Sequence, residues 1–335
     1  MKTGTAVLLS MAIVVAGLAA TAGVGYAVYR NIEGQIEKGA AQTGADAGLP
    51  DSGAQTPGCA KADDDAQAKA VLAPADEALR KTQRPVARIE LSALARDDAG
   101  ISKVGGQAYW AAGRDYPRDG KGQPLFLLAQ VNLAEVPKMP GYPERGMLQF
   151  FISGDDYYGA ALDDAHGQGR MDALAKQAGF RVIYWPELAA AAIAPPKATA
   201  GADSLPFDPA KPQRMRFIAD HETIGANDAH FEQALEGGVQ PLIERYRGEH
   251  PDATEEDLQD ALSDYLSRSG HKLGGYPDFT QSDPRESSDR RLLLFQLDSD
   301  DALMWGDSGI ANFFIDPDDL ARADFSRVSY HWDCY

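Results

Sequence analysis

LLAQVNL at 127–133 recurs as LLFQLDS at 293–299, and these two strings decide the fold. Each string is a short apolar run interrupted by one glutamine, Gln130 in the first and Gln296 in the second. Apolar runs of this length with branched and aromatic residues are typical of buried β-strands. The sequence therefore predicts a sheet-forming unit that is built twice.

Three further strings recur in the same order, which extends the repeat in both directions. They are SKVGG at 102–106 with HKLGG at 271–275, GMLQFFI at 146–152 with GIANFFI at 309–315, and RVIY at 181–184 with RVSY at 327–330. The offsets between the paired strings run from 169 through 166 and 163 to 146 residues. Ordered self-similarity of this kind indicates related structural units. We expect two β-rich halves at about 100–190 and 270–335.

The segment between these halves carries the clearest helical pattern. Thr254 is a candidate N-cap before three acidic residues, Leu258 and Leu262 fall on one face, and Gly270 ends the pattern. Phe231 and Leu235 give an earlier segment, 228–236, the same spacing. The predicted fold class is α+β, with internally duplicated β-rich halves and intervening helices.

The N-terminus reads as a membrane segment followed by a tether. Thr3 to Tyr29 are 27 residues without a charge, long enough for a transmembrane signal-anchor over residues 1–30. Ala20-Thr21-Ala22 also resembles a cleavage site, so a signal peptide is the alternative. Residues 31–84 are rich in Ala, Gly and Asp and predict a disordered tether before a domain at 85–335. We expect that domain outside the cytoplasm, periplasmic or extracellular, and secreted if the signal is cleaved.

Composition and motifs exclude several classes of function. The net charge of −18 would repel a nucleic-acid backbone, so we expect no nucleic-acid partner. GDSG at 306–309 mimics a serine-protease motif, but the upstream histidine would fall in the tether, and a tight turn is the alternative. The histidines lack the i, i+4 spacing of a helical zinc site. We assign no catalytic residue, no metal ligand and no cofactor.

Polar residues embedded in apolar strands are the candidate ligand-binding residues. A buried amide must find partners, so Gln130 and Gln296 either tie their strands to neighbouring loops or line a groove between the halves. In the second interpretation Trp305 is a stacking wall and lysines and an arginine face the groove. The candidates are Lys103, Gln130, Gln149, Lys272, Tyr276, Gln281, Asp283, Arg285, Gln296, Trp305 and Asn312.

Two features remain open to alternatives. The loop 275–285 is dense in turn-forming residues and in side chains capable of recognition, and it is the first place to expect a binding site. Its alternative is an ordered loop closed by Asp283 and Arg285. Cys59 and Cys334 could form a disulfide in an oxidising compartment, or could be a flexible thiol and a buried one.

These strings resemble the YwqG-like family, known chiefly as a domain of unknown function. The resemblance rests on SKVGG, on GMLQFFISGDDYYG at 146–159 and on HKLGGYPDFTQSDPR at 271–285, and covers about 88–335. It implies an internally duplicated α+β fold, no established reaction, and relatives similar to immunity or accessory proteins near toxin genes. We expect a membrane-tethered, non-catalytic binding module for a protein or small polar ligand. The alternatives are an immunity protein that neutralises a toxin by binding, and an enzyme of unrecognised type.

Overall fold

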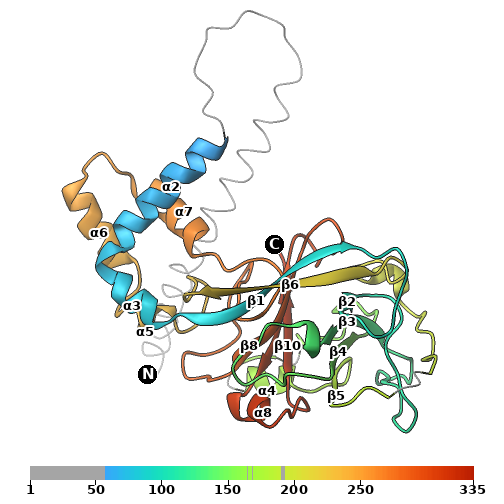
Figure 1. Cartoon of the computed structure of the whole chain (residues 1–335). Helices are drawn as coiled ribbons and strands as arrows, with labels where there is room; N and C mark the ends of the chain where they lie inside the picture. The colour runs from blue at the N-terminus through green and yellow to red at the C-terminus, as the bar shows by residue number, and fades with distance from the viewer. Residues whose placement is uncertain (1–56, 164, 168, 190–192) are drawn as a thin grey trace, which may run out of the picture. The chain divides into compact units, whose positions relative to one another are not determined.

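The computed structural model describes residues 57–163, 165–167, 169–189 and 193–335. In this part of the chain ten strands form one sheet in the order β10-β9-β8-β7-β1-β6-β2-β3-β4-β5 (Figure 1). All of its ladders are antiparallel. The strands are β1 (Arg84–Ala93), β2 (Lys103–Val104), β3 (Phe126–Asn132), β4 (Met147–Ile152), β5 (Phe180–Trp185), β6 (Gln213–Glu222), β7 (Lys272–Gly274), β8 (Leu292–Asp298), β9 (Ile310–Ile315) and β10 (Ser329–Asp333).

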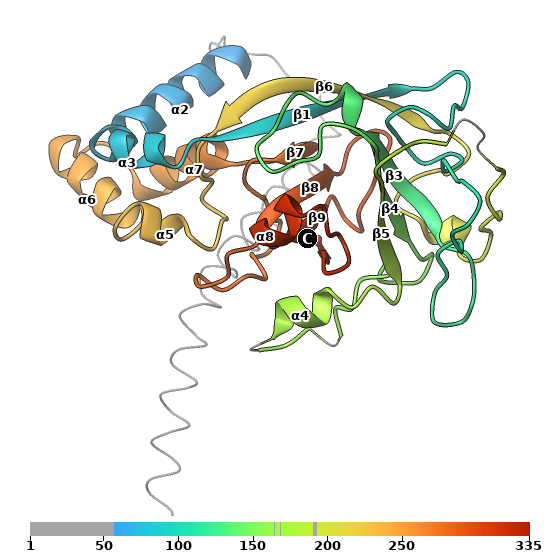
Figure 2. The ribbon, with the colours of Figure 1, turned by 60° about the horizontal axis from the view of Figure 1, so that its bottom comes forward.

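The sheet is duplicated about its central pair, β1 and β6. These two strands pair along their whole length, and Figure 2 shows them running side by side. In the strand order they lie between β7–β10 and β2–β5. Both halves interrupt the register at the same point, between Leu127 and Ala129 in one and between Leu293 and Phe295 in the other. The repeated strings therefore occupy equivalent ladder positions.

The two halves exchange their long strands. β1 precedes the first half in the chain but pairs with β7 of the second, and β6 pairs with β2 of the first. Arg88 lies opposite Lys272, and Arg214 lies opposite Lys103 at the equivalent position. Because each long strand hydrogen-bonds to the other half, neither half can complete its sheet alone.

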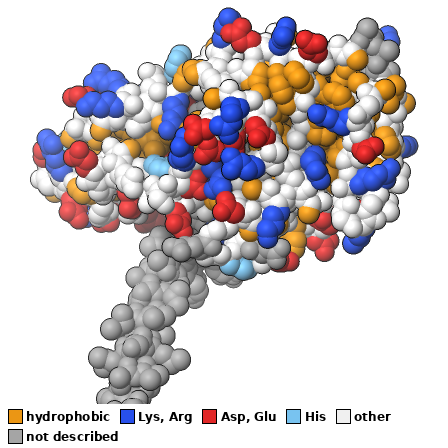
Figure 3. All heavy atoms as spheres, turned by 90° about the horizontal axis from the view of Figure 1, so that it is seen from below, with side chains coloured by type: hydrophobic (Ala, Val, Ile, Leu, Met, Phe, Trp, Pro, Cys, Tyr) orange, Lys and Arg blue, Asp and Glu red, His pale blue; other side chains and the backbone are white. Residues whose placement is uncertain are grey.

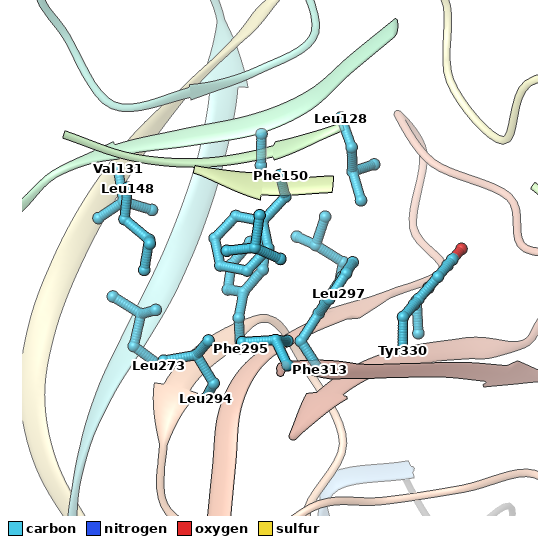
Figure 4. Close-up of a cluster of buried hydrophobic side chains, with 14 of the residues drawn as sticks. Leu128, Val131, Leu148, Phe150, Leu273, Leu294, Phe295, Leu297, Phe313 and Tyr330 are labelled. Atoms are coloured by element: carbon cyan, nitrogen blue, oxygen red, sulfur yellow. The ribbon is translucent and has the colours of Figure 1, made fainter. Parts of the chain in front are cut away.

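The space between the halves is the main hydrophobic core (Figure 4). The ring of Phe150 from the first half lies 4.6 Å from that of Phe295 and 4.8 Å from that of Phe313 in the second. Phe180 on the end strand β5 lies 5.2 Å from Tyr330 on the opposite end strand β10. The ends of the sheet thus approach each other, and the sheet curves into a near-barrel.

Helices form a smaller cluster beside β1 and β6. The predicted helix is α7 (Glu255–Leu266), and the Thr254 side chain accepts a hydrogen bond from Asp257 N as its N-cap. It packs with α2 (Pro57–Leu72) and α6 (Gln240–Glu249) around a separate apolar cluster. The remaining α-helices are short: α3 (Asp76–Lys81), α4 (Arg170–Leu174), α5 (Phe231–Ala234) and α8 (Pro317–Ala321).

Helices α2 and α3 lie inside the stretch that the composition assigned to a disordered tether. Ala68, Val71 and Leu72 of α2 are buried in the cluster with α7. A segment poor in aromatic residues is therefore ordered by packing against the helices of another segment. The compact unit that the described residues form begins at Pro57.

Two predictions about the fold class are corrected. The α+β class is wrong, because the described residues form one ten-stranded antiparallel sheet with few helices. None of the described helices is long and apolar enough to cross a membrane, and the longest, α2, has 16 residues and several charges. The predicted transmembrane segment, residues 1–30, lies outside the described residues. The membrane anchor and the extracytoplasmic or secreted location inferred from it are not retained.

Candidate functional site

Each half carries a row of polar side chains on the outer face of its sheet, away from the core. In the first half Lys103 lies opposite Gln130, which lies opposite Gln149. In the second half the same positions hold Lys272, Gln296 and Asn312. All six side chains are fully buried. They do not line a groove between the halves, because the facing inner surfaces are filled by apolar residues.

In the second half the row is bonded to the loops that cover it. Lys272 Nζ donates to Glu222 Oε1 at 2.9 Å, and burial lowers the pKa of Lys272 to about 8 against the opposing effect of Glu222. Gln296 Oε1 accepts from Asp278 N at 2.9 Å, and its Nε2 donates to Arg268 O and Gly270 O. Every polar atom of the Gln296 amide thus has a partner in the fold.

The first half repeats these contacts at equivalent positions. Lys103 Nζ bonds to Asp97, as Lys272 does to Glu222. Gln130 Oε1 accepts from Tyr109 N at 2.9 Å, and its Nε2 donates to Ala99 O and Ile101 O. The predicted lysines and glutamines therefore make the contacts expected of residues that tie strands to loops.

The double glycine of each half follows from the same arrangement. Gly275 has a φ of +70°, and a Cβ on it would lie 2.1 Å from Glu222 Oε1. The equivalent Gly106 has a φ of +73°, and its Cβ would lie 2.7 Å from Asp97 Oδ2. Only glycine combines this backbone conformation with such a close carboxylate. The repeated Gly-Gly motif is explained by the buried lysine–carboxylate pair and needs no ligand.

The two rows differ at their outer ends. Gln149 lies opposite Ile183 on β5, whereas Asn312 lies opposite His331 on β10. Gln149 Oε1 accepts from Trp185 Nε1 at 2.7 Å, but Asn312 Oδ1 and His331 Nδ1 are both buried without a partner. Buried polar atoms are nearly always satisfied in folded proteins. Since the first half folds with an apolar residue at this position, the fold itself does not require a histidine there.

His331 lines a cleft of about 360 Å³ on this outer face. One wall is the loop at Gln281, which is held over β10 because Asp333 accepts from Thr280 N at 3.2 Å and Gln281 N at 2.9 Å. The segment around Tyr157 also lines the cleft, and the Tyr157 carbonyl accepts a hydrogen bond from Trp332 Nε1 at 2.8 Å. The further lining residues are Asp156, Leu162, Ala165, His166, Arg170, Ser282 and Cys334.

The electrostatics of the cleft keep His331 neutral. Burial lowers the pKa of His331 to about 4, with a further lowering from the charge of Arg170 and an opposing effect from Asp333. Arg170, at the start of α4, supplies a cation to the same cleft, and its Nε donates to Ala165 O at 3.0 Å. The cleft thus offers an uncharged imidazole beside a permanent positive charge.

The predicted recognition loop contributes unequally to this cleft. Gln281 lines it, and its Nε2 donates to Cys334 O at 2.5 Å. Asp283 and Arg285 instead form a buried ion pair at 2.6 Å, which Arg285 extends to Asp228 at 2.7 Å. Tyr276 is buried with its hydroxyl on Thr82 O. These three predicted residues hold the loop and the neighbouring helices in place.

Trp305 and the two cysteines do not form the predicted groove wall or a described disulfide. Trp305 is fully buried in the main core, 5.6 Å from the ring of Tyr158, and does not form a wall of a groove. Cys334 is a free thiol, and the side chain of Cys59 lies outside the described residues, so their pairing stays a prediction. Within 57–335, apart from the gaps, no group of three or more His, Cys, Asp or Glu residues is placed to hold a metal ion.

Sequence reasoning missed His331, Asp333 and Arg170. The repeat contains the signal for His331 and Asp333. The pairing of RVIY with RVSY, however, aligns the last strands of the two halves at an offset of 146 residues, which is not the offset of the ladders. The ladders make Ile183 equivalent to His331, an offset of 148. With that register, an apolar position in one copy and a polar one in the other marks the site. Arg170 carries no comparable signal.

Comparison with known families gives one match. Residues 102–334 match the family described as Domain of unknown function (DUF1963), which is 233 of the 335 residues. No curated protein matches the chain. The match agrees with the expectation of a domain of unknown function.

Proposed function

The chain belongs to the DUF1963 family, a domain of unknown function, and we propose that it is a binding module for a small polar ligand held in the cleft beside His331. The observation that carries the proposal is His331, which lines a surface cleft and whose Nδ1 is buried without a hydrogen-bond partner. The finer assignment to the YwqG-like group rests on the strings at 102–106 and 271–285 and belongs to the same proposal.

Binding is favoured over turnover by the state of the charged groups. The carboxylate of Asp333 is engaged by two backbone N–H groups, so it is held as a structural clamp. His331 has a pKa of about 4 because of its burial, which makes it a weak base at neutral pH. A neutral imidazole and an arginine are well suited to orient a ligand by hydrogen bonds.

A toxin-neutralising protein partner is the weaker candidate. If the net charge of −18 is to steer a basic protein partner toward this chain, the chain needs an extended acidic face. The face seen in Figure 3 carries basic and acidic side chains next to each other. Mixed charge of this kind gives little long-range steering on that face.

Equilibrium dialysis of the full chain against a panel of small amides, hydroxy acids and amino acids tests the proposal. Arg170→Ala removes the cation of the cleft and is expected to weaken any panel compound that binds there by about 10- to 100-fold, the range of a lost charge-assisted hydrogen bond. Arg145→Ala is the matched control, since Arg145 is 78% exposed and lines no part of this cleft. Equal binding by both variants would contradict the placement of the site.

A further inference from the structure

His230 lies between two hydrogen-bond acceptors. It directly precedes α5, and its side chain is 31% exposed. Its Nδ1 lies 2.8 Å from Asp228 Oδ1, and its Nε2 lies 2.8 Å from the backbone carbonyl oxygen of Asp289. Burial acts to raise the pKa of Asp228, but the hydrogen bond with His230 and the charge of Arg285 outweigh it and lower the pKa to about 2. Asp228 is therefore ionised.

Only one protonation state of His230 satisfies both contacts. A carboxylate and a backbone carbonyl can only accept, so each contact needs an N–H from the ring. A neutral imidazole carries one N–H, whereas the imidazolium carries two. The geometry therefore requires a protonated ring while both contacts are made.

His271 shows the opposite arrangement. Its Nδ1 accepts from Asp298 N at 3.0 Å, and its Nε2 lies 3.0 Å from Asp300 Oδ2. A backbone N–H can only donate, so Nδ1 of His271 carries no proton and Nε2 carries the single one. His271 is thus an internal reference for the charged state of His230.

The charged groups around His230 favour the imidazolium. Asp228 on the same turn, with Asp283 and Arg285 from the loop after β7, makes a cluster of two carboxylates and one guanidinium. The imidazolium neutralises the remaining negative charge of this cluster. The hydrogen bond with Asp228 raises the pKa of His230 above its ordinary value of 6.5, against the lowering by burial and by the charge of Arg285.

Asp289 belongs to a segment, 286–291, that reaches the proposed site. Its side chain is paired with Arg291 at 2.6 Å, and Arg291 continues to Asp172 on α4 at 2.5 Å. The segment and α4 both line a second cleft of about 310 Å³. Arg170, at the start of α4, lines this second cleft and also the proposed ligand cleft. A contact that fixes the segment 286–291 therefore acts on the surroundings of Arg170.

We propose that the His230 imidazolium is a pH-sensitive clamp on the segment 286–291, and that its loss of a proton weakens ligand binding at the cleft beside His331. The second part of this inference rests on the proposed function. The neutral ring keeps the stronger, charge-assisted bond to Asp228 and loses the one to the Asp289 carbonyl. Since the pKa is raised in the folded chain, the clamp is complete below pH 6.5 and is released as the pH rises through the raised value.

Histidine ¹⁵N spectra of the full chain from pH 5 to pH 9 test the charge of His230 in the native protein. The signals are assigned through single His→Gln variants. We expect His230 to carry two protons at pH 6 and to titrate with a midpoint above 6.5, while His271 at pH 7 has its single proton on Nε2. A midpoint of His230 at or below 6.5 would overturn the inference without the use of a stability measurement.

Hydrogen exchange of backbone amides tests whether the ring holds the segment. The protection of residues 286–291, corrected for intrinsic rates, is expected to fall about 10-fold from pH 6 to pH 9, the effect of one lost charge-assisted hydrogen bond. His230→Gln should be poorly protected at both pH values. His221→Gln, at an exposed histidine of β6, is the matched control and should behave as the native protein. No fall in the native protein, or the same fall in His230→Gln, would overturn the clamp.

Equilibrium dialysis with acetamide at the same two pH values tests the effect on the ligand cleft. We expect the dissociation constant of the native protein to rise about 5-fold from pH 6 to pH 9, the low end of couplings between sites, and that of His230→Gln to stay constant. His331 does not titrate in this range, because burial lowers its pKa to about 4. Equal affinities in the native protein would overturn the link to the cleft. No binding of acetamide at either pH would count against the proposed function, and the two other measurements would still decide the clamp.

Discussion

Replacing His331 by isoleucine gives the second half the residue that the first half carries at position 183. The change removes a half-buried ring whose Nδ1 atom is buried without a partner, a defect that costs about 1–3 kcal/mol in a folded protein. It also adds apolar area on an outer face that already packs Phe279 and Phe314. We expect His331→Ile to raise the free energy of unfolding by about 1–2 kcal/mol near pH 7.5.

Acid pH should enlarge this difference. The pKa of His331 is about 4 in the folded chain because of burial, against 6.5 in the unfolded one. The unfolded chain therefore binds the proton first, and the native protein loses stability as the pH falls from 6.5 toward 4. At pH 5 this linkage amounts to about 2 kcal/mol, and it is absent from the isoleucine variant.

Urea denaturation at pH 7.5 and at pH 5 measures both effects. The reasoning predicts that the gain of His331→Ile over the native protein is about 2 kcal/mol larger at pH 5. Ile183→His is the matched control in the first half and should lose stability, more so at pH 5. A variant destabilised by more than about 1 kcal/mol at pH 7.5, or with the native pH dependence, would show that His331 is a structural residue.

The remaining predictions concern the duplicated rows. Gln296→Leu and Gln130→Leu should each lower the free energy of unfolding by about 2–4 kcal/mol, because each leaves buried backbone groups without partners, and urea midpoints would show it. Gln281→Ala, at an exposed side chain, should change it by less than about 0.5 kcal/mol. Glu222→Gln should cost about 3–5 kcal/mol by leaving the Lys272 ammonium buried without its partner, and adding Lys272→Met should restore part of this loss. A Glu222→Gln variant as stable as the native protein, or a double variant no better than the single one, would contradict the account of the lysine–carboxylate pair.

The strands that the sequence predicts best are those with one clear pattern. The apolar strings at 127–133 and 293–299 overlap β3 and β8, and the repeated string at 327–330 overlaps the start of β10. The helix after Thr254 has both an N-cap and an apolar face, and α7 begins at the next residue. In these segments local propensity and burial agree, so the pattern alone is sufficient.

The elements that the sequence analysis did not predict depend on contacts between segments that are distant in the chain. β6 carries four charged residues in its ten, because it is sheltered by β1 and β2 on its edges rather than by a continuous apolar face. α2 has almost no amphipathic pattern, and its order comes from packing on α7 and α6. The α+β class was wrong because the exchange of β1 and β6 between the halves joins their strands into a single sheet.

The sequence analysis named one residue of the candidate site, Gln281 in the loop 275–285, and missed His331 on β10. Gln281 lies in the loop that the turn-forming residues marked, and it lines the cleft. Lys103, Gln130 and Gln296 drew attention as polar residues in apolar strands, but such residues are satisfied within the fold here. His331 directly follows the repeated string RVSY at 327–330, and only its comparison with Ile183 distinguishes it.

The most direct test of the account is a map of backbone amide shifts in the deuterated full chain on titration with acetamide. The account predicts that the shifts cluster at the cleft, around Tyr157, Gln281 and His331, and that the equivalent positions around Ile183 do not move. Shifts centred on the outer face of the first half, or an unchanged spectrum at the cleft, would contradict the claim that the second half has become the binding half of this duplicated fold.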